Sequence, residues 1–319
     1  MSIDLTASKQ IGRYGPVLSI CIPTFNRAEV TEETVKRILS LPDFGTQTEI
    51  VVSDNCSTDD TEDRMRRIAA GHDSFVYSRN TKNIGDRNFY EVMRCAKGQY
   101  LKLSNDTLRY KPGGLEKIRN IVERYNPALL LFLRKNSGNV SICRSLDDLI
   151  NRASYAITWI GGLCIRRDAL SIAEAAVTKS ESHLFQVELV IDIVNSGQRV
   201  LVVKEDIFEV KEQTRKGGYD LFGVFVHNYL VLLSKQVNQG KLSREVLQRE
   251  KLRLLFNFVI PWLTKLYLWK RKRYFFKIRL SAVTDWYSPI ALVFLFPTGI
   301  VVSSVRALSR RLAVSLRTA

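Results

Sequence analysis

Four short polar groups in the first third of the chain carry the side chains best suited to binding a charged ligand. They combine carboxylate, amide, hydroxyl and guanidinium groups, which can donate and accept hydrogen bonds and form ion pairs. The four groups are Pro23–Arg27, Ser53–Asn55, Arg79–Asn80 and Ser104–Asp106. Each group follows directly after a strand-like segment, so the arrangement of those strands decides whether the groups meet.

The segments in front of the polar groups are mainly apolar and are separated by helix-like stretches. They are Val17–Ile22, Glu49–Val52, Phe75–Tyr77 and Tyr100–Leu103. This alternation predicts an α/β fold with a Rossmann-like, mostly parallel sheet flanked by helices. In such a sheet the C-terminal ends of the strands share one edge, and ligands bind in the crevice there. We therefore expect the polar groups to form one site.

Several motifs in this order resemble the family 2 glycosyltransferases. The motifs are Leu18–Arg27, Glu49–Thr61, Asn83–Asn88 and Ala96–Tyr100. The resemblance covers the first two thirds of the chain and implies a GT-A fold, an inverting mechanism and a nucleotide-sugar donor. The motifs resemble in particular those of the enzymes that build bacterial surface polysaccharides, such as O-antigen or capsule.

The resemblance also implies which residues contact the donor. Asp54 would accept a hydrogen bond from the base, Thr24 would lie beside the nucleotide, and Arg87 would pair with diphosphate oxygens. The donor-binding residues implied in this way are Pro23, Thr24, Asn26, Arg27, Asp54, Asn55, Arg87, Ser104 and Asn105. Purely structural alternatives exist, because Asp and Asn are common turn residues and Arg87 could lie on a solvated helix face.

The group Ser104–Asp106 departs from the family pattern. The family usually carries two or three consecutive aspartates where this chain has Ser104, Asn105 and Asp106. Asp106 falls on the position that holds a divalent cation, Mg²⁺ or Mn²⁺, and Asn105 on a neighbour that meets the ribose. Such a cation neutralises charge on the departing diphosphate. With one carboxylate left, we expect weakened metal binding; the alternative is a strand-to-turn cap.

The middle of the chain is expected to complete the catalytic domain. The segment 157–167 predicts a strand that carries the glycine pair Gly161–Gly162, and a helix is expected from Ser182. In the family this helix start supplies an acidic general base, but the corresponding residues here are apolar or neutral. His183 and Glu188 are the nearest groups able to take a proton. Either could instead be structural.

The C-terminal region is both basic and apolar. Residues 241–319 contain 16 Lys and Arg against 3 Asp and Glu, which is +13 of the net charge of +16. A basic cluster at 269–277, rich in aromatics, and an uncharged run at 286–305 are typical of contact with an anionic membrane surface. Two prolines in that run favour shallow insertion over a full span, and 300–317 predicts an amphipathic helix. A helical domain packed on the core is the alternative.

These features predict an N-terminal tail over 1–15, a GT-A catalytic domain over 16–215, and a helical membrane-associating region over 216–319. Five cysteines, an odd number without a C-x-x-C pair, and the lack of an evident signal peptide indicate the reduced cytosol. We expect the cytoplasmic face of the inner membrane, a lipid-linked saccharide acceptor and no nucleic-acid partner, since no nucleic-acid-binding module appears. Alternatives are a nucleotidyltransferase, whose glycine-rich basic entry loop is missing, and a membrane-bound scaffold that has lost catalysis.

Overall fold

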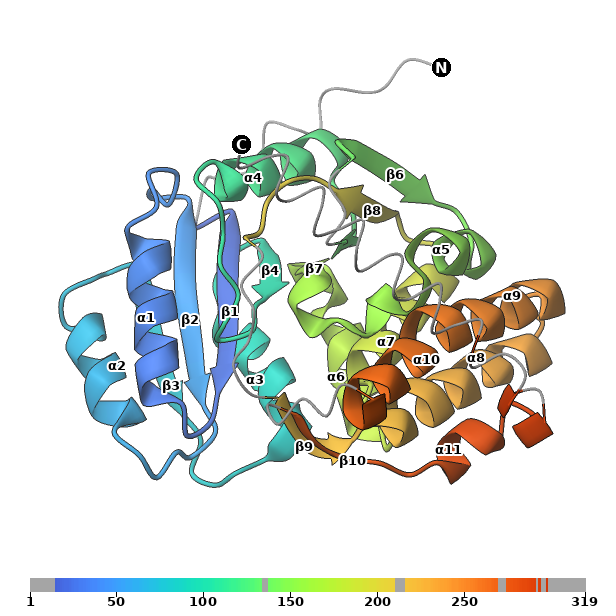
Figure 1. Cartoon of the computed structure of the whole chain (residues 1–319). Helices are drawn as coiled ribbons and strands as arrows, with labels where there is room; N and C mark the ends of the chain where they lie inside the picture. The colour runs from blue at the N-terminus through green and yellow to red at the C-terminus, as the bar shows by residue number, and fades with distance from the viewer. Residues whose placement is uncertain are drawn as a thin grey trace, which may run out of the picture. The chain divides into compact units, whose positions relative to one another are not determined.

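The contacts of the chain divide it into two units. The structure is a computed structural model and describes residues 15–133, 137–209, 216–268, 274–290, 292–293 and 297. The first unit comprises 1–181 and 185–212, and the second comprises 182–184 and 213–319. Figure 1 shows the whole chain. We describe the units separately below.

An eight-stranded sheet forms the centre of the first unit (Figure 1). Its strands are β1 (Leu18–Thr24), β2 (Thr48–Asp54), β3 (Phe75–Arg79), β4 (Tyr100–Leu103), β5 (Leu129–Phe132), β6 (Asn139–Cys143), β7 (Leu163–Arg166) and β8 (Val200–Lys204). They lie in the order β3-β2-β1-β4-β7-β5-β8-β6. β7 runs antiparallel to β4 and β5, and β6 runs antiparallel to β8, while the other pairs are parallel. The prediction of a mostly parallel sheet flanked by helices is confirmed.

Seven α-helices connect the described strands of this unit. They are α1 (Ala28–Leu39), α2 (Thr61–Ala69), α3 (Asn88–Cys95), α4 (Gly114–Tyr125), α5 (Leu146–Ala153), α6 (Leu170–Lys179) and α7 (Phe185–Asn195). Short 3₁₀ turns lie at η2 (Gly85–Arg87), η3 (Ser154–Thr158), η4 (Ile160–Gly162) and η5 (Arg167–Ala169). α1 packs beside α2, and α3 packs beside α6, which in turn contacts α7. With helices on both faces, β2 and β4 are buried along their whole length.

The strand order reverses direction between β1 and β4. The chain moves outward from β1 to β2 and β3, and then returns to place β4 on the other side of β1. Right-handed crossovers therefore put α1 and α2 on one face of the sheet and α3 on the other. Such a reversal opens a crevice at the C-terminal ends of the two strands, where ligands bind in open α/β sheets. The loops after β1 and β4 thus flank the expected site.

A buried carboxylate fixes the entry into β4. Glu49 Oε1 accepts hydrogen bonds from Ser19 Oγ at 2.6 Å, from the Lys97 amide at 2.5 Å and from the Gly98 amide at 3.1 Å. A Cβ on Gly98 would lie 2.8 Å from the Ser19 amide, closer than real Cβ atoms come. The chain therefore needs glycine at this position so that β4 can enter the sheet beside β1.

The glycine pair does not lie in a strand, as the sequence predicted. Gly161 and Gly162 form the turn η4, and the strand β7 begins only at Leu163. The reason is the side chain of Trp159, which packs over both glycines, so that a Cβ on either one would come within about 3.0 Å of its ring atoms. The prediction of a strand over 157–167 is thus correct only for its last third.

The described part of the second unit is mostly helical. Its helices are α8 (Tyr229–Asn238), α9 (Arg244–Leu254), α10 (Ile260–Leu263) and α11 (Ser281–Thr284), with π-helical turns η6 (Gly223–Asn228), η7 (Leu255–Val259) and η8 (Thr264–Leu268). Two parallel strands, β9 (Lys216–Asp220) and β10 (Tyr274–Lys277), form a small sheet that the sequence did not indicate. Among the helices described, none is long and apolar enough to cross a membrane. Most of the basic cluster and of the uncharged run, and the expected amphipathic helix, lie outside the described residues.

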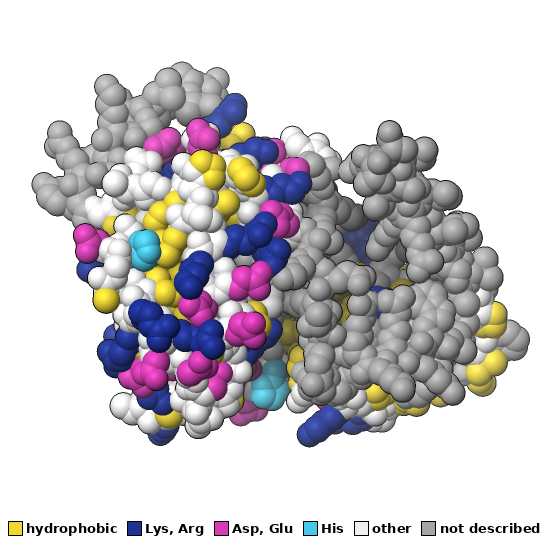
Figure 2. All heavy atoms as spheres, turned by 60° about the vertical axis from the view of Figure 1, so that its left-hand side comes forward, with side chains coloured by type: hydrophobic (Ala, Val, Ile, Leu, Met, Phe, Trp, Pro, Cys, Tyr) yellow, Lys and Arg dark blue, Asp and Glu magenta, His cyan; other side chains and the backbone are white. Residues whose placement is uncertain are grey.

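The charged side chains of the first unit are mixed in sign. Figure 2 shows basic and acidic side chains interspersed on the face that it turns toward the viewer. On α1 and α2 they pair with one another: Arg64 contacts Glu32 and Asp60, each at 2.7 Å, and Lys36 contacts Glu32 at 2.7 Å. This balance agrees with the location of most of the net positive charge beyond residue 240.

Candidate functional site

An ion pair between Arg27 and Asp106 crosses the point where the strand order reverses. Arg27 Nε lies 3.1 Å from Asp106 Oδ2, and the two side chains are 46% and 9% exposed. Burial raises the pKa of the Asp106 carboxyl, and the nearby Arg27 guanidinium opposes that rise. Thr34 Oγ1 donates a 2.6 Å hydrogen bond to the Asp106 carbonyl. This bond connects the group Ser104–Asp106 to α1. One buried carboxylate and one partly exposed guanidinium therefore meet between the loops after β1 and β4.

The other two residues of the group Ser104–Asp106 lie against β1 and η4. The Ser104 amide donates to the Cys21 carbonyl at 2.8 Å, which continues the pairing of β4 with β1. Asn105 is half-buried, and its Oδ1 lies so close to η4 that a Cβ on Gly161 would come within 2.5 Å of it. The glycine turn and the group Ser104–Asp106 thus lie in close contact.

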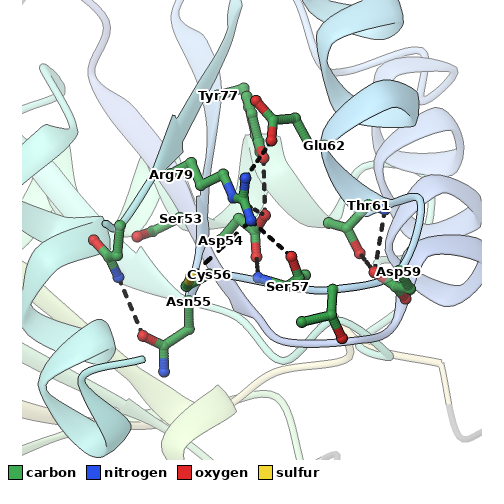
Figure 3. A network of polar contacts seen from close by, with 12 residues as sticks. Ser53, Asp54, Asn55, Cys56, Ser57, Asp59, Thr61, Glu62, Tyr77 and Arg79 are labelled. Carbon is green, nitrogen blue, oxygen red and sulfur yellow. Dashed lines mark hydrogen bonds and ion pairs between the residues drawn. The ribbon is translucent and has the colours of Figure 1, made fainter. Parts of the chain in front are cut away.

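Asp54 lies at the centre of a polar network at the end of β2 (Figure 3). Its side chain is fully buried. Oδ1 accepts from the Ser57 amide at 2.9 Å, while Oδ2 accepts from Tyr77 Oη at 2.9 Å and lies 3.5 Å from Arg79 Nε. The Arg79 guanidinium also pairs with Glu62 and donates to the Ser57 carbonyl at 2.8 Å. Asp54 therefore joins β2, β3 and the loop after β2, whatever it contributes to donor binding.

Two of the other residues expected to bind the donor hold loops together. Asn26 has a positive φ of 50°, and its Oδ1 accepts from the Thr58 amide at 2.7 Å. Asn55 donates to Asn83 Oδ1 at 2.8 Å and accepts from the Ile84 amide at 2.9 Å. These contacts shape the rim of the crevice.

Thr24 and Pro23 end β1 itself. Thr24 is buried, and its hydroxyl lies 2.7 Å from the Thr31 hydroxyl of α1. The Thr24 carbonyl accepts from the Asn55 amide at 2.9 Å. Pro23 is half-buried beside it. This end of β1 is therefore fixed to both α1 and the loop after β2.

Arg87 stands exposed at the end of η2, on a loop that buried amides hold in place. Asn88 is the main anchor of this loop: its Oδ1 accepts from Ser53 Oγ at 2.6 Å and from Asn80 Nδ2 at 2.8 Å, and its Nδ2 donates to the Ser53 carbonyl at 2.9 Å. Within the described ranges, Arg87 forms no ion pair. Its guanidinium is thus available to an anion. Sequence reasoning missed the anchoring role of Asn88, although the residue stood within a recognised motif.

The two candidates for the general base lie in different surroundings. Glu188 is half-buried on the first turn of α7, and its Oε1 accepts from Ser180 Oγ at 2.8 Å. His183 is exposed, has a positive φ of 55° and groups by its contacts with the second unit. Gln186, which stands where an acidic pair is common in the family, donates to the Thr158 carbonyl at 2.8 Å. By their contacts, Glu188 thus belongs to the first unit and His183 to the second.

The residues at the crevice can be tested for their fit to a divalent cation. No group of three or more His, Cys, Asp or Glu side chains gathers in the described part of the chain. Within Ser104–Asp106, Asp106 is the residue that carries a carboxylate, and its Oδ2 is paired with Arg27. Mg²⁺ commonly binds through one or two carboxylates together with substrate phosphates. The donor set thus fits a cation that Asp106 shares with a diphosphate.

Comparison with known families assigns the first part of the chain. Residues 19–157 match the model of the family described as Glycosyl transferase family 2. The predicted resemblance is therefore confirmed over these residues. The match includes all four polar groups at the sheet edge.

Two curated relatives are similar over part of the chain. Abequosyltransferase RfbV of Salmonella typhimurium is 41% identical over 87 residues, which are 26% of this chain and 26% of that protein. The GalNAc(5)-diNAcBac-PP-undecaprenol beta-1,3-glucosyltransferase of Campylobacter jejuni is 30% identical over 129 residues, 40% of this chain and 41% of that protein. The matched region thus spans less than half the length of either relative.

Solved structures share the fold over most of the chain. TarS 1–349 of S. aureus in complex with UDP-GlcNAc has a TM-score of 0.56 and 17% identity, covering 79% of this chain and 76% of that one. The mannosyltransferase PcManGT of Pyrobaculum calidifontis, in complex with GDP-Man and Mn²⁺, has a TM-score of 0.56 and 16% identity, covering 95% and 93%. The chain therefore has the predicted GT-A type fold.

Proposed function

We propose that the chain is an inverting glycosyltransferase that moves a sugar from a nucleotide-sugar donor to a hydroxyl of a lipid-linked saccharide. The observation that carries the proposal is the Arg27–Asp106 pair at the reversal of the strand order, inside the family 2 domain. The name of the Campylobacter relative contains PP-undecaprenol, which supports the acceptor class. The two solved structures with UDP-GlcNAc and GDP-Man support the donor class.

In this proposal the crevice binds the donor diphosphate between the loops after β1 and β4. Arg27 leaves Asp106 and pairs with phosphate oxygens, for which a guanidinium has matching geometry. Arg87 provides a second cationic contact from its anchored loop. Asp54 and Asn55 shape the base-binding end, and Ser104 and Asn105 line the sugar-facing end next to Gly161. These side chains orient the anomeric carbon toward the acceptor.

The chemical step is a single displacement at the anomeric carbon. The acceptor oxygen forms the new bond while the bond to the nucleoside diphosphate breaks, and a base takes the hydroxyl proton. When bound, Mg²⁺ or Mn²⁺ held by Asp106 would supply charge neutralisation for the departing diphosphate. Glu188 and His183 are the two candidates for the base. We place this reaction at the cytoplasmic face of the inner membrane, in the synthesis of a surface polysaccharide.

The test is transfer by the purified chain from a panel of nucleotide sugars to lipid-linked acceptors, with products identified by mass spectrometry. The same method applied to cells lacking the gene should show a lipid-linked saccharide that accumulates one sugar short. Product with an inverted anomeric linkage supports the proposal. Donor binding without transfer to any acceptor would favour the catalytically inactive scaffold, and transfer of the nucleotidyl group would favour a nucleotidyltransferase.

A further inference from the structure

Lys102 is a fully buried lysine in the central strand β4, one residue away from the group Ser104–Asp106. Its Nζ donates hydrogen bonds to the Leu103 carbonyl and to the Gly161 carbonyl, each at 2.6 Å. Lysine is almost never fully buried unless its ammonium group is paired. In the described part of the chain, no carboxylate forms an ion pair with Lys102. A buried lysine held by carbonyl groups alone calls for a specific explanation.

The surroundings of Lys102 are aromatic and neutral. Its Nζ lies 5.6 Å from the ring centre of Phe132 and 5.2 Å from that of Phe208. The titratable groups facing it are the thiols of Cys21 on β1 and Cys164 on β7, whose pKa values are both raised by burial. Neutral thiols and ring faces can stabilise a cation only weakly compared with a carboxylate. The two carbonyl groups are therefore the main partners of Nζ.

Gly161 connects Lys102 to the group Ser104–Asp106. Its carbonyl accepts from Lys102 Nζ, while its Cα faces Asn105 so closely that a Cβ would come within 2.5 Å of Asn105 Oδ1. The second acceptor is the carbonyl of Leu103, which is the last residue of β4 and directly precedes Ser104. One amino group thus binds both the strand that ends in the motif and the turn that packs against it.

We propose that Lys102 is a positioning residue, which ties the end of β4 to the Gly161 turn and so fixes Asn105 and Asp106 at the crevice. Lys102 acts through the backbone, since it is sealed from solvent and cannot reach a substrate. Its effect on transfer rests on the proposed function. Its effect on the order of the motif does not.

The protonation state of this tether responds to pH in a predictable direction. Burial lowers the pKa of Lys102 to about 7. A neutral amine keeps two N–H groups, which match the two carbonyl acceptors, so deprotonation preserves both hydrogen bonds. Between pH 7 and about 10 the unfolded chain, with an ordinary lysine, binds more protons than the folded chain. Stability should therefore rise with pH across this window.

The experiment compares Lys102→Met with the wild-type chain, and uses Lys36→Met, which removes an exposed lysine on α1, as the control. Hydrogen exchange is measured at the amides of Ser104, Leu108 and Gly162, whose acceptors are Cys21, Asn105 and Trp159 carbonyls. In Lys102→Met these amides should exchange at least about tenfold faster, because a net hydrogen bond is worth about that factor. In Lys36→Met they should not change. Unchanged exchange in a folded Lys102→Met would overturn the proposal.

A pH series tests the burial of the Lys102 amino group independently of hydrogen exchange. The folding equilibrium constant of the wild type should rise by up to about tenfold per pH unit between pH 7 and 10, relative to Lys102→Met, which lacks this titration. If Lys102→Met does not fold, Lys102→Gln is measured instead, because its side chain keeps N–H donors but is one bond too short to reach both carbonyl groups in the same way. Faster exchange at Ser104 and Leu108 in Lys102→Gln supports the proposal, and unchanged exchange there refutes it. Because none of these measurements requires transfer, failure of the proposed function would leave them intact.

Discussion

Asp106 is the carboxylate on which the proposed transfer depends most directly. Asp106→Asn keeps the shape of the side chain but removes its charge and its pairing with Arg27. Transfer should fall by about 100- to 1,000-fold, the usual cost of losing one group that stabilises transition-state charge. The measurement is kcat for transfer at several Mg²⁺ or Mn²⁺ concentrations. The activity that remains should respond less to the cation.

The control for this change is Asp206→Asn, which removes a carboxylate that pairs with Lys111 at 2.6 Å on the surface. It should leave kcat and the cation dependence unchanged. Full activity of Asp106→Asn in the presence of a chelator would refute the assignment of Asp106 to the cation. Loss of activity together with loss of the folded circular-dichroism spectrum would instead indicate a structural role.

Asp54 is expected to contribute to stability as well as to donor binding. Asp54→Asn leaves Arg79 without its buried partner and weakens the hydrogen bond from Tyr77. Because breaking one member of a buried charged network commonly costs about 2–4 kcal/mol, the free energy of unfolding should fall by about that amount. Urea denaturation measures it. Calorimetry with nucleoside diphosphates, on the folded variant, then reports any separate loss of affinity.

Asp60→Asn is the matched control, because Asp60 lies on the loop after β2, is 54% exposed and pairs with Arg64 of α2. An exposed pair is worth about 0–1 kcal/mol. If both variants lose the same small amount of stability, the Asp54 network does not hold the sheet edge. If Asp54→Asn loses stability but keeps full donor affinity, the inferred contact with the base is wrong.

At the scale of elements, the register of β4 beside β1 depends on Gly98. Gly98→Ala would place a Cβ against the hydroxyl and amide of Ser19, and would disturb the bonds that Glu49 receives. Overpacking of this kind costs about 1–3 kcal/mol, so we expect a loss in that range by urea denaturation. Gly15→Ala is the control, since its Cβ would meet only the Lys97 carbonyl at 3.9 Å. Equal stability of both variants would contradict the inferred role of Gly98 in the register of β4.

The elements themselves could largely be predicted from the sequence. The apolar runs at 17–22, 49–52, 75–77 and 100–103 correspond to the strands β1 to β4. β1, β2 and β3 each continue two residues further at the C-terminal end, and β4 coincides with its run. Local composition sufficed because a strand covered on both faces is continuously apolar. It did not suffice for β7, since the glycines before it are packed under Trp159, a contact that no local pattern reports.

The candidate site was predictable as a location but not as a set of contacts. Parallel strands bring the groups after β1, β2 and β4 to one edge, and this follows from topology alone. Some of these side chains form hydrogen bonds with residues distant in sequence, as Asn26 does with Thr58 and Asn55 with Asn83. Local sequence patterns do not report such partners. Burial of Lys102 was equally hidden, because a single lysine in a short strand normally faces solvent.

At the scale of the whole molecule, charge and chemistry are divided along the chain. The four polar groups at the sheet edge fall before residue 107, while +13 of the net charge of +16 falls in residues 241–319. A basic, aromatic-rich segment separated from the proposed site suits a role in bringing the enzyme to an anionic membrane that carries its acceptor. We therefore propose that the C-terminal region docks on the membrane surface.

The last prediction tests this docking in the full chain. Replacing Lys270, Arg271, Lys272 and Arg273 by Gln should weaken sedimentation with anionic liposomes by at least about tenfold, because each basic residue near such a surface contributes about 1 kcal/mol. Added salt should weaken binding of the wild type in the same direction, since it screens charge. A fraction that persists at high salt would be held by the apolar run at 286–305.

A control with the same loss of charge separates docking from net charge. Replacing Arg67, Lys97, Lys117 and Arg124, which are exposed on the first unit, by Gln removes four positive charges elsewhere. If only the substitutions at 270–273 reduce liposome binding, the C-terminal region is the docking surface. If both sets reduce it equally, attraction reflects the net charge of the molecule, and preferential binding to DNA over liposomes would favour a nucleic-acid partner instead.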